Sequence, residues 1–167
     1  MAKITRLAFV GFGSFAKQLL NLGVDWHDRI LTAFDPSVLC AKTCKRQLET
    51  FIAFGVQGCF SIEDAINGAQ IIILSDHDHL ASPWQSELLD HLCPQHVVVD
   101  FRSQNTNAFK TRVEEKHATY LQGEITLNQD NVSISSPNVG ELQQLFQSMD
   151  VPRQNILVQH APLSKYR

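Results

Sequence analysis

The chain has 167 residues, of which 44% are hydrophobic and 19% are charged, and its formal net charge at pH 7 is −3. This composition is typical of a globular protein and excludes intrinsic disorder. The weak net charge gives no support to nucleic acid or an anionic membrane as a partner.

Neither a secretory signal nor a membrane span is visible in the sequence. The first apolar run, residues 7–10, is too short for a signal core, and no stretch approaches the ~20 apolar residues of a span. Four cysteines form no CxxC pair, so we predict a reduced, cytoplasmic protein without a metal site. Cys40 and Cys44 are four residues apart and are expected to share a helix face, either as packed small residues or as a metal or redox pair.

Short apolar runs and amphipathic segments alternate along the first 120 residues. Continuous apolar runs are typical of strands that are buried on both faces. Strands are predicted over residues 7–10, 30–34, 55–60, 71–74, 97–99 and 119–121. Helices are predicted over residues 14–22, 38–48, 61–69, 83–92 and 107–116, with Ser37 and Ser61 as N-caps and Gly23 as a C-cap.

This alternation indicates right-handed βαβ crossovers, and hence an α/β fold of Rossmann-like, doubly wound type: a mostly parallel sheet with helices on both faces. After about residue 123 the pattern changes. Residues 124–136 alternate apolar and polar positions around a turn at 128–131, which predicts edge strands or a hairpin near the C-terminus. An amphipathic helix over 138–149 and a strand over 155–159 follow. No linker divides the chain, so residues 1–167 are predicted to be one domain.

A glycine-rich turn joins the first predicted strand to the first helix with the spacing G-x-G-x-x-A. Gly11 permits a sharp turn, Gly13 lets a pyrophosphate approach the backbone, and Ala16 keeps the helix close to the sheet. Free amides at the start of the helix attract phosphate. The predicted phosphate-binding residues are Gly11, Phe12, Gly13, Ser14, Phe15 and Ala16.

Asp35 ends the second strand, 22 residues after Gly13, and Pro36 follows it. A carboxylate at this place accepts hydrogen bonds from both hydroxyls of an adenosine ribose and repels a 2′-phosphate, which favours NAD over NADP. Basic residues between 42 and 46 soften that preference, so NADP stays possible. In the alternative interpretation, the glycines only form a tight turn and Asp35 only caps a turn before Pro36.

The stretches "LAFVGFGSFA", "AFDP", "SIEDAINGAQIIILS" and "PQHVVVDFRS" resemble the N-terminal domain of the β-hydroxyacid dehydrogenases, the group of 6-phosphogluconate and 3-hydroxyisobutyrate dehydrogenases. The resemblance covers residues 6–167 and is closest over the first hundred. The glycine turn is shared with all Rossmann dehydrogenases, whereas the run at 68–74 and the V-V-V-D-x-x-S pattern are more particular to this group.

The resemblance implies that Ser75 and Asp76 lie beside the nicotinamide ribose. The stretch 76–79, Asp-His-Asp-His, departs from the family's small or apolar residues. Its side chains either bind a metal or relay a proton, or they are solvated loop residues.

The resemblance also implies substrate and catalytic positions. Of the family's Ser-Gly-Gly substrate segment only Gly123 is present, and Arg102 and Ser103 follow the fifth strand near the expected substrate. Arg102 either pairs with a ligand carboxylate or phosphate or is a solvated surface residue. Lys165 is the candidate catalytic general acid or base, a role that requires burial to lower its pKa.

Two functions of different class follow. The first is an NAD(P)-dependent oxidoreductase acting on a hydroxyacid, which needs a partner or the family's all-helical C-terminal domain, absent from these 167 residues. The second is a non-catalytic Rossmann module, a sensor, assembly element or decayed paralogue that binds a nucleotide or no cofactor; a flavin or adenosyl compound is a third possible ligand. A homodimer is expected because Leu142, Leu145 and Phe146 crowd one helix face, unless these residues are core.

Overall fold

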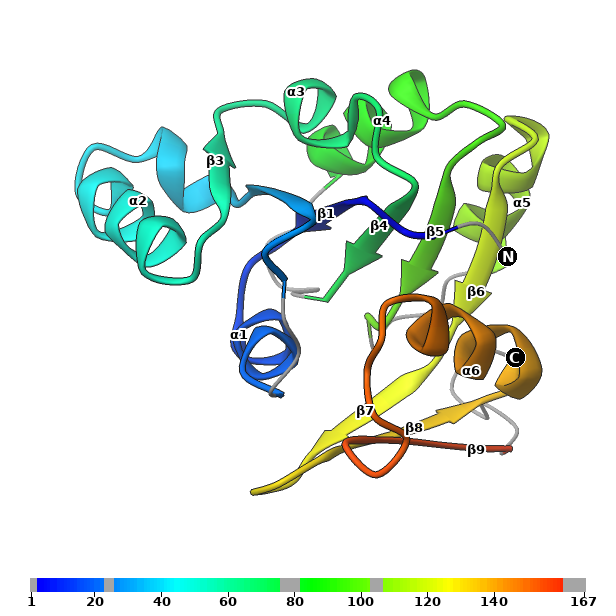
Figure 1. The fold of residues 1–167 in the computed structure, drawn as a ribbon. Coiled ribbons are helices and arrows are strands. Elements are labelled where there is room, and N and C mark those ends of the chain that lie inside the picture. The colour runs from blue at the N-terminus through cyan, green and yellow to red at the C-terminus, as the bar shows by residue number, and fades with distance from the viewer. Residues whose placement is uncertain (1–2, 23–25, 76–81, 103–106, 161–167) are drawn as a thin grey trace.

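The computed structural model describes residues 3–22, 26–75, 82–102 and 107–160, and its main element is a parallel six-stranded sheet (Figure 1). The strands run in the order β3-β2-β1-β4-β5-β6. They are β1 (Arg6–Val10), β2 (Ile30–Phe34), β3 (Gln57–Cys59), β4 (Ile71–Leu74), β5 (Val97–Asp100) and β6 (Thr119–Gln122). The order reverses between β1 and β4, as in a doubly wound Rossmann sheet, so the predicted fold class is confirmed.

Helices cover both sides of this sheet, with α1 on one side and α3 and α4 together on the other (Figure 1). The helical elements are α1 (Ser14–Leu20), η1 (Pro36–Leu39), α2 (Cys44–Ala53), α3 (Ile62–Ile66), α4 (Ser82–His91) and α5 (Asn107–Glu115). Because both faces are covered, Leu7, Phe9 and Ile73 in the central strands are fully buried.

A second, three-stranded sheet follows the sixth strand (Figure 1). It contains β7 (Glu124–Leu127), β8 (Val132–Ser136) and β9 (Ile156–His160), with α6 (Val139–Ser148) between the last two strands. The strands β7 and β8 are antiparallel, whereas β8 and β9 are parallel. The predicted hairpin, helix and last strand are therefore confirmed, and they form a sheet of their own beside the main one.

Several polar contacts tie the small sheet and α6 to the Rossmann layer. Gln18 in α1 donates from Nε2 to the Asn128 carbonyl oxygen at 2.7 Å. Asn155 Nδ2 donates to the Leu22 carbonyl oxygen at 2.7 Å, and Arg29 Nη2 contacts Asp150 Oδ2 at 2.8 Å. Because these contacts lie on different elements, they join the small sheet to the main one at more than one point.

The predicted helix over 38–48 is wrong. The chain forms the short η1 and then a separate α2, because Cys40 has an extended backbone that ends η1. Cys40 and Cys44 consequently do not share a helix face. By contrast, the predicted cap at Ser61 is confirmed, since its hydroxyl accepts from the Asp64 amide at 3.1 Å. The predicted cap at Gly23 lies outside the described residues.

The apolar face of α6 is core. Leu142 and Leu145 are fully buried and Phe146 is 3% exposed within the single chain. The core alternative is thus correct for these three residues, and they give no support to a dimer. In the described part of the chain no helix could cross a membrane, and no cluster of three metal-binding side chains occurs.

Gly123 lies where the chain passes from β6 to β7, and the packing there leaves no room for a side chain. A Cβ at this position would lie 2.9 Å from Ile134 Cγ2 and 3.2 Å from Phe101 Cε1. The amide of Gly123 donates to the Asp100 carbonyl oxygen at 3.1 Å. Close packing therefore explains why this position is a glycine. The substrate contact of Gly123 stays a prediction.

We expect Gly123→Ala to lower the free energy of unfolding by about 1–3 kcal/mol because its methyl group overpacks this junction. Gly140 in α6 is the matched control, since a Cβ there meets nothing within 4 Å. Gly140→Ala should leave stability unchanged or raise it by up to ~1 kcal/mol. Urea unfolding measures both, and equal effects of the two substitutions would contradict the packing argument.

His96 is a buried, neutral histidine that closes the turn before β5. Its Nδ1 accepts from the Cys93 amide at 3.0 Å, and its Nε2 lies 3.0 Å from the Ile66 carbonyl oxygen, to which it donates. Burial lowers the pKa of His96 below its usual value. The folded chain therefore binds a proton at this site less readily than the unfolded chain.

Because the folded pKa is lowered, the stabilisation from neutral His96 is present above the ordinary histidine pKa of about 6.5 and is lost as the pH falls through the folded pKa. The free energy of unfolding should therefore decrease between about pH 7.5 and pH 5.5, and decrease less in His96→Gln. His117→Asn, at an exposed position, serves as the control. A pH dependence that is the same in His96→Gln as in the unaltered chain would refute this assignment.

Candidate functional site

The turn between β1 and α1 leaves the start of α1 open. Gly11 has φ 84°, which favours glycine, and its amide donates to the Phe34 carbonyl oxygen at 2.8 Å. Gly13 is the N-cap of α1 and has no side chain to cap the helix, and no side chain of the described residues accepts from the helix's first amides. Ser14 is exposed beside them. These amides are therefore donors that an anion can use.

The aromatic residues of the turn point into the core and fix its shape. The Phe12 ring is 3% exposed and lies 5.2 Å from the ring of Phe51 and 5.6 Å from that of Phe9, measured between centroids. The Phe15 ring lies 4.8 Å from that of Phe101, and Ala16 is fully buried. Phe12, Phe15 and Ala16 thus position the backbone by packing, and the open groups belong to Gly13 and Ser14.

Asp35 is turned toward the glycine-rich turn and is 3% exposed. Its Oδ2 accepts from the Phe12 amide at 3.0 Å. Its Oδ1 accepts from the Ser37 amide at 3.0 Å and from the Ser37 hydroxyl at 2.7 Å, so the carboxylate also caps η1, which Pro36 begins. The turn-capping interpretation of Asp35 is therefore confirmed, whereas its contact with a ribose stays a prediction.

These three bonds limit what Asp35 can still bind. A carboxylate has about four lone-pair positions, two on each oxygen. Both positions of Oδ1 are used within the chain, and Oδ2 keeps one. The count leaves Asp35 one free acceptor position, fewer than the two ribose hydroxyls of the prediction would use, and the side chain is 3% exposed.

Ser75 follows β4 and meets the glycine turn at the point where the strand order reverses. It is 8% exposed, and its hydroxyl donates to the Gly11 carbonyl oxygen at 3.3 Å. The crevice at such a reversal is where doubly wound folds bind ligands. The structure brings Ser75 and Gly11 together, and the place of Ser75 beside a nicotinamide ribose stays a prediction. Residues 76–79, Ser103 and Lys165 lie outside the described residues.

Arg102 is buried in an ion pair, so the prediction of a solvated surface arginine is wrong. It is 6% exposed, and its Nε and Nη2 contact the two oxygens of Asp100 at 2.9 and 2.8 Å. Its Nη1 donates to Gln85 Oε1 at 3.0 Å, and the guanidinium lies 4.4 Å from the centroid of the Phe109 ring. The guanidinium that was predicted to pair with a ligand is thus hydrogen-bonded to Asp100 and Gln85.

Tyr120 completes this ion-pair cluster, and sequence reasoning missed it. Its hydroxyl donates to Asp100 Oδ2 at 2.7 Å from the neighbouring strand β6. Asp100 is 1% exposed, so its charge is satisfied by one cation, one phenol and the Arg102 amide. The two-residue spacing of Asp100 and Arg102 was a local signal for the pair, whereas the contacts of Tyr120 and Gln85 depend on tertiary packing.

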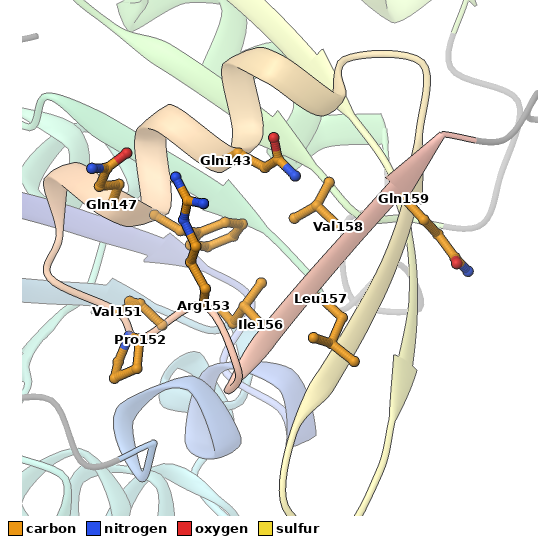
Figure 2. A pocket seen from close by; sticks show the side chains of 10 residues that line it. Gln143, Gln147, Val151, Pro152, Arg153, Ile156, Leu157, Val158 and Gln159 are labelled. Carbon is orange, nitrogen blue, oxygen red and sulfur yellow. The ribbon is translucent and has the colours of Figure 1, made fainter.

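Two hollows lie near the small sheet, one along α1 and one between α6 and β9. A polar cleft of ≈ 600 Å³ begins at Ser14 and continues along α1 to the β7–β8 turn. An apolar groove of ≈ 280 Å³ lies between α6 and β9, where Ile156 and Val158 point toward the helix (Figure 2). None of the residues predicted for binding or catalysis lines the groove. Ser14 lines the cleft, whereas Gly11, Gly13, Asp35 and Ser75 line neither hollow.

No protein-family model and no curated protein matches the sequence. Solved structures do match the fold. A conserved hypothetical protein from Sinorhizobium meliloti 1021 aligns with a TM-score of 0.75 and 15% identity over 99% of this chain and 57% of that one. The 3-hydroxyisobutyrate dehydrogenase of Mycobacterium tuberculosis, solved with L-serine, aligns with a TM-score of 0.70 and 16% identity over 98% and 57%.

An imine reductase from Myxococcus stipitatus in complex with NADP+ aligns with a TM-score of 0.66 and 17% identity, over 94% of this chain and 54% of that one; its V8 variant was solved with NAD+. The chain thus spans a little over half the length of these neighbours. The fold likeness to a 3-hydroxyisobutyrate dehydrogenase that the sequence indicated is confirmed.

The buried pair predicts a large effect of losing its cation. Arg102→Met should lower the free energy of unfolding by about 3–5 kcal/mol because Asp100 is left buried without its counter-ion. Arg112 is exposed on α5, and Arg112→Met should change stability by no more than ~0.5 kcal/mol. Denaturant unfolding compares the two, and a similar small loss in both variants would show that the pair does not stabilise the fold.

Proposed function

We propose that this chain is a nicotinamide-dinucleotide-binding domain that holds NAD at the carboxyl edge of its parallel sheet. One observation carries the proposal: the Asp35 carboxylate, at the end of β2, is directed at the glycine turn through its 3.0 Å bond from the Phe12 amide. An acceptor at this place next to an uncapped helix start suits a ribose joined to a diphosphate.

The residues present fit such a ligand. The first amides of α1 would donate to the diphosphate, with the Ser14 hydroxyl beside them. The remaining lone pair of Asp35 Oδ2 would accept one ribose hydroxyl, and the Ser75 side chain would border the nicotinamide ribose. Phe12 and Phe15 hold these groups in place through their buried rings.

The choice of NAD over NADP rests on Asp35. A 2′-phosphate would bring a second negative charge next to a carboxylate that is 3% exposed and therefore poorly screened. Fold neighbours have been solved in complex with NADP+ and with NAD+. They support a nicotinamide dinucleotide as the ligand and do not decide between NAD and NADP. Four free cysteines support a reducing, cytoplasmic location.

The reaction proposed for the whole protein is hydride transfer with a hydroxyacid, because one of the fold neighbours is a 3-hydroxyisobutyrate dehydrogenase. The dinucleotide would supply the hydride acceptor or donor. Lys165 is the candidate general acid or base, and additional elements or a partner would be needed to enclose the substrate.

A non-catalytic nucleotide-binding module is the second candidate, and one observation favours it. Arg102, which the family resemblance places near the substrate, is bound to Asp100 and Gln85. A site whose cation is already paired lacks a ready group for a substrate carboxylate.

Titration of the purified chain with NADH and NADPH by fluorescence tests the proposal. We expect saturable binding of both with NADH preferred. In Asp35→Asn the Kd for NADH should rise by about tenfold, because a charged acceptor is lost, while binding of NADPH changes less. Asp28→Asn is the matched control, because Asp28 is exposed and its contact is a 4.0 Å ion pair with Lys3.

Absence of saturable binding by the unaltered chain would refute dinucleotide binding. Where NADH binds, turnover of a panel of β-hydroxyacids separates the two candidates. We expect none from this chain by itself, and measurable turnover would exclude the non-catalytic module.

A further inference from the structure

The Ser37 hydroxyl lies between two oxygen atoms but has only one proton to donate. Its Oγ is 2.7 Å from Asp35 Oδ1 and 3.1 Å from Gln47 Oε1. The shorter contact ends on a carboxylate, which is the stronger acceptor. The proton therefore goes to Asp35, and the contact with Gln47 needs a donor on the glutamine side.

The nitrogen of the Gln47 side-chain amide also indicates that Gln47 donates to Ser37. Gln47 Nε2 is buried and has no hydrogen-bond partner among the described residues. A buried amide nitrogen without an acceptor is rare in folded proteins, whereas an underused carbonyl oxygen is less so. The oxygen and nitrogen of a side-chain amide are alike in shape. Rotating the Gln47 amide by about 180° places Nε2 next to Ser37 Oγ, which provides the missing donor and leaves no unpaired nitrogen.

We infer that Gln47 and Ser37 are positioning residues that set the preference for NAD through Asp35, an inference that rests on the proposed dinucleotide binding. Gln47 Nε2 donates to Ser37 Oγ, and Ser37 Oγ donates to Asp35 Oδ1. We call these three side chains the Asp35 relay. It links the ribose-side carboxylate to α2, an element that the glycine turn does not include.

The Asp35 relay has two consequences for a ligand. It saturates Oδ1 with the amide and hydroxyl of Ser37, so that the last lone pair of Oδ2 is the one offered to a ribose hydroxyl. In the relay the hydroxyl proton of Ser37 is donated to Asp35, and an amide proton of Gln47 is donated to Ser37. Hydroxyl and amide protons are donors that a 2′-phosphate needs, so the relay withholds them from NADP.

Gln47→Leu tests this role. Without its donor the Ser37 hydroxyl can rotate away from Asp35, so the Kd for NADH should rise about fivefold while that for NADPH stays the same or falls. Glu49→Gln on the exposed face of α2 is the matched control and should leave both Kd values unchanged. Equal weakening of NADH and NADPH binding, in step with a lower melting temperature, would mean that Gln47 is only structural and would overturn the inference.

A double-mutant cycle gives the second readout. Ser37→Ala alone should weaken NADH binding as Gln47→Leu does, and the double variant should be no weaker than Ser37→Ala, because one substitution already breaks the relay. Additive losses would overturn the inference.

The hydrogen bond between Gln47 and Ser37 is tested without nucleotide. The side-chain amide proton signals of Gln47, observed by NMR in the free chain, should shift in Ser37→Ala and stay unchanged in Glu49→Gln. Unshifted signals in Ser37→Ala would overturn the relay itself. An unaltered chain that shows this shift but binds neither NADH nor NADPH would instead refute the dinucleotide and, with it, the preference assigned to Gln47.

Discussion

The bond from the Phe12 amide to Asp35 Oδ2 is the interaction on which the candidate site depends. It joins the end of β2 to the turn after β1, and so couples two strand ends through a side chain as well as through the sheet ladder. Gly11 makes the turn possible, and the buried ring of Phe12 prevents its backbone from turning away. The orientation of the carboxylate is therefore a property of the core as much as of the loop, and packing changes around Phe12 act on the site.

The sequence predicted the fold well because its signals are local and repeated. Four-residue runs such as Ile71–Leu74 have few alternatives to a buried parallel strand, and the order of elements then permits few topologies. The failures occurred where a local rule had a competitor. Ser37 looks like a helix cap by composition, but Asp35 captures both its amide and its hydroxyl and forms η1 instead.

The site was predictable to a smaller extent. The glycine spacing and an acid at the end of β2 are encoded in short stretches, and these residues do meet in the structure. What could not be read from the sequence is how many of Asp35's lone pairs the chain uses itself. The burial of Arg102 could not be read from the sequence either, because its partner Gln85 comes from α4, and Tyr120, which donates to Asp100, comes from β6.

Asp35 and Asp100 show how two carboxylates at the same edge of one sheet acquire different roles. Both follow an apolar strand, and both are at least 97% buried. The charge of Asp100 is balanced by a guanidinium, and a phenol donates to the same carboxylate. These contacts hold β5, β6 and α4 together. From the described part of the chain, Asp35 receives uncharged donors only, which orient it without neutralising it. An oriented charge with a vacant lone pair is what recognition of a neutral hydroxyl requires. Among the described residues, β5, β6 and α4 are thus held together by a buried ion pair, whereas the carboxylate beside β1 and β2 is oriented by hydrogen bonds without a counter-ion.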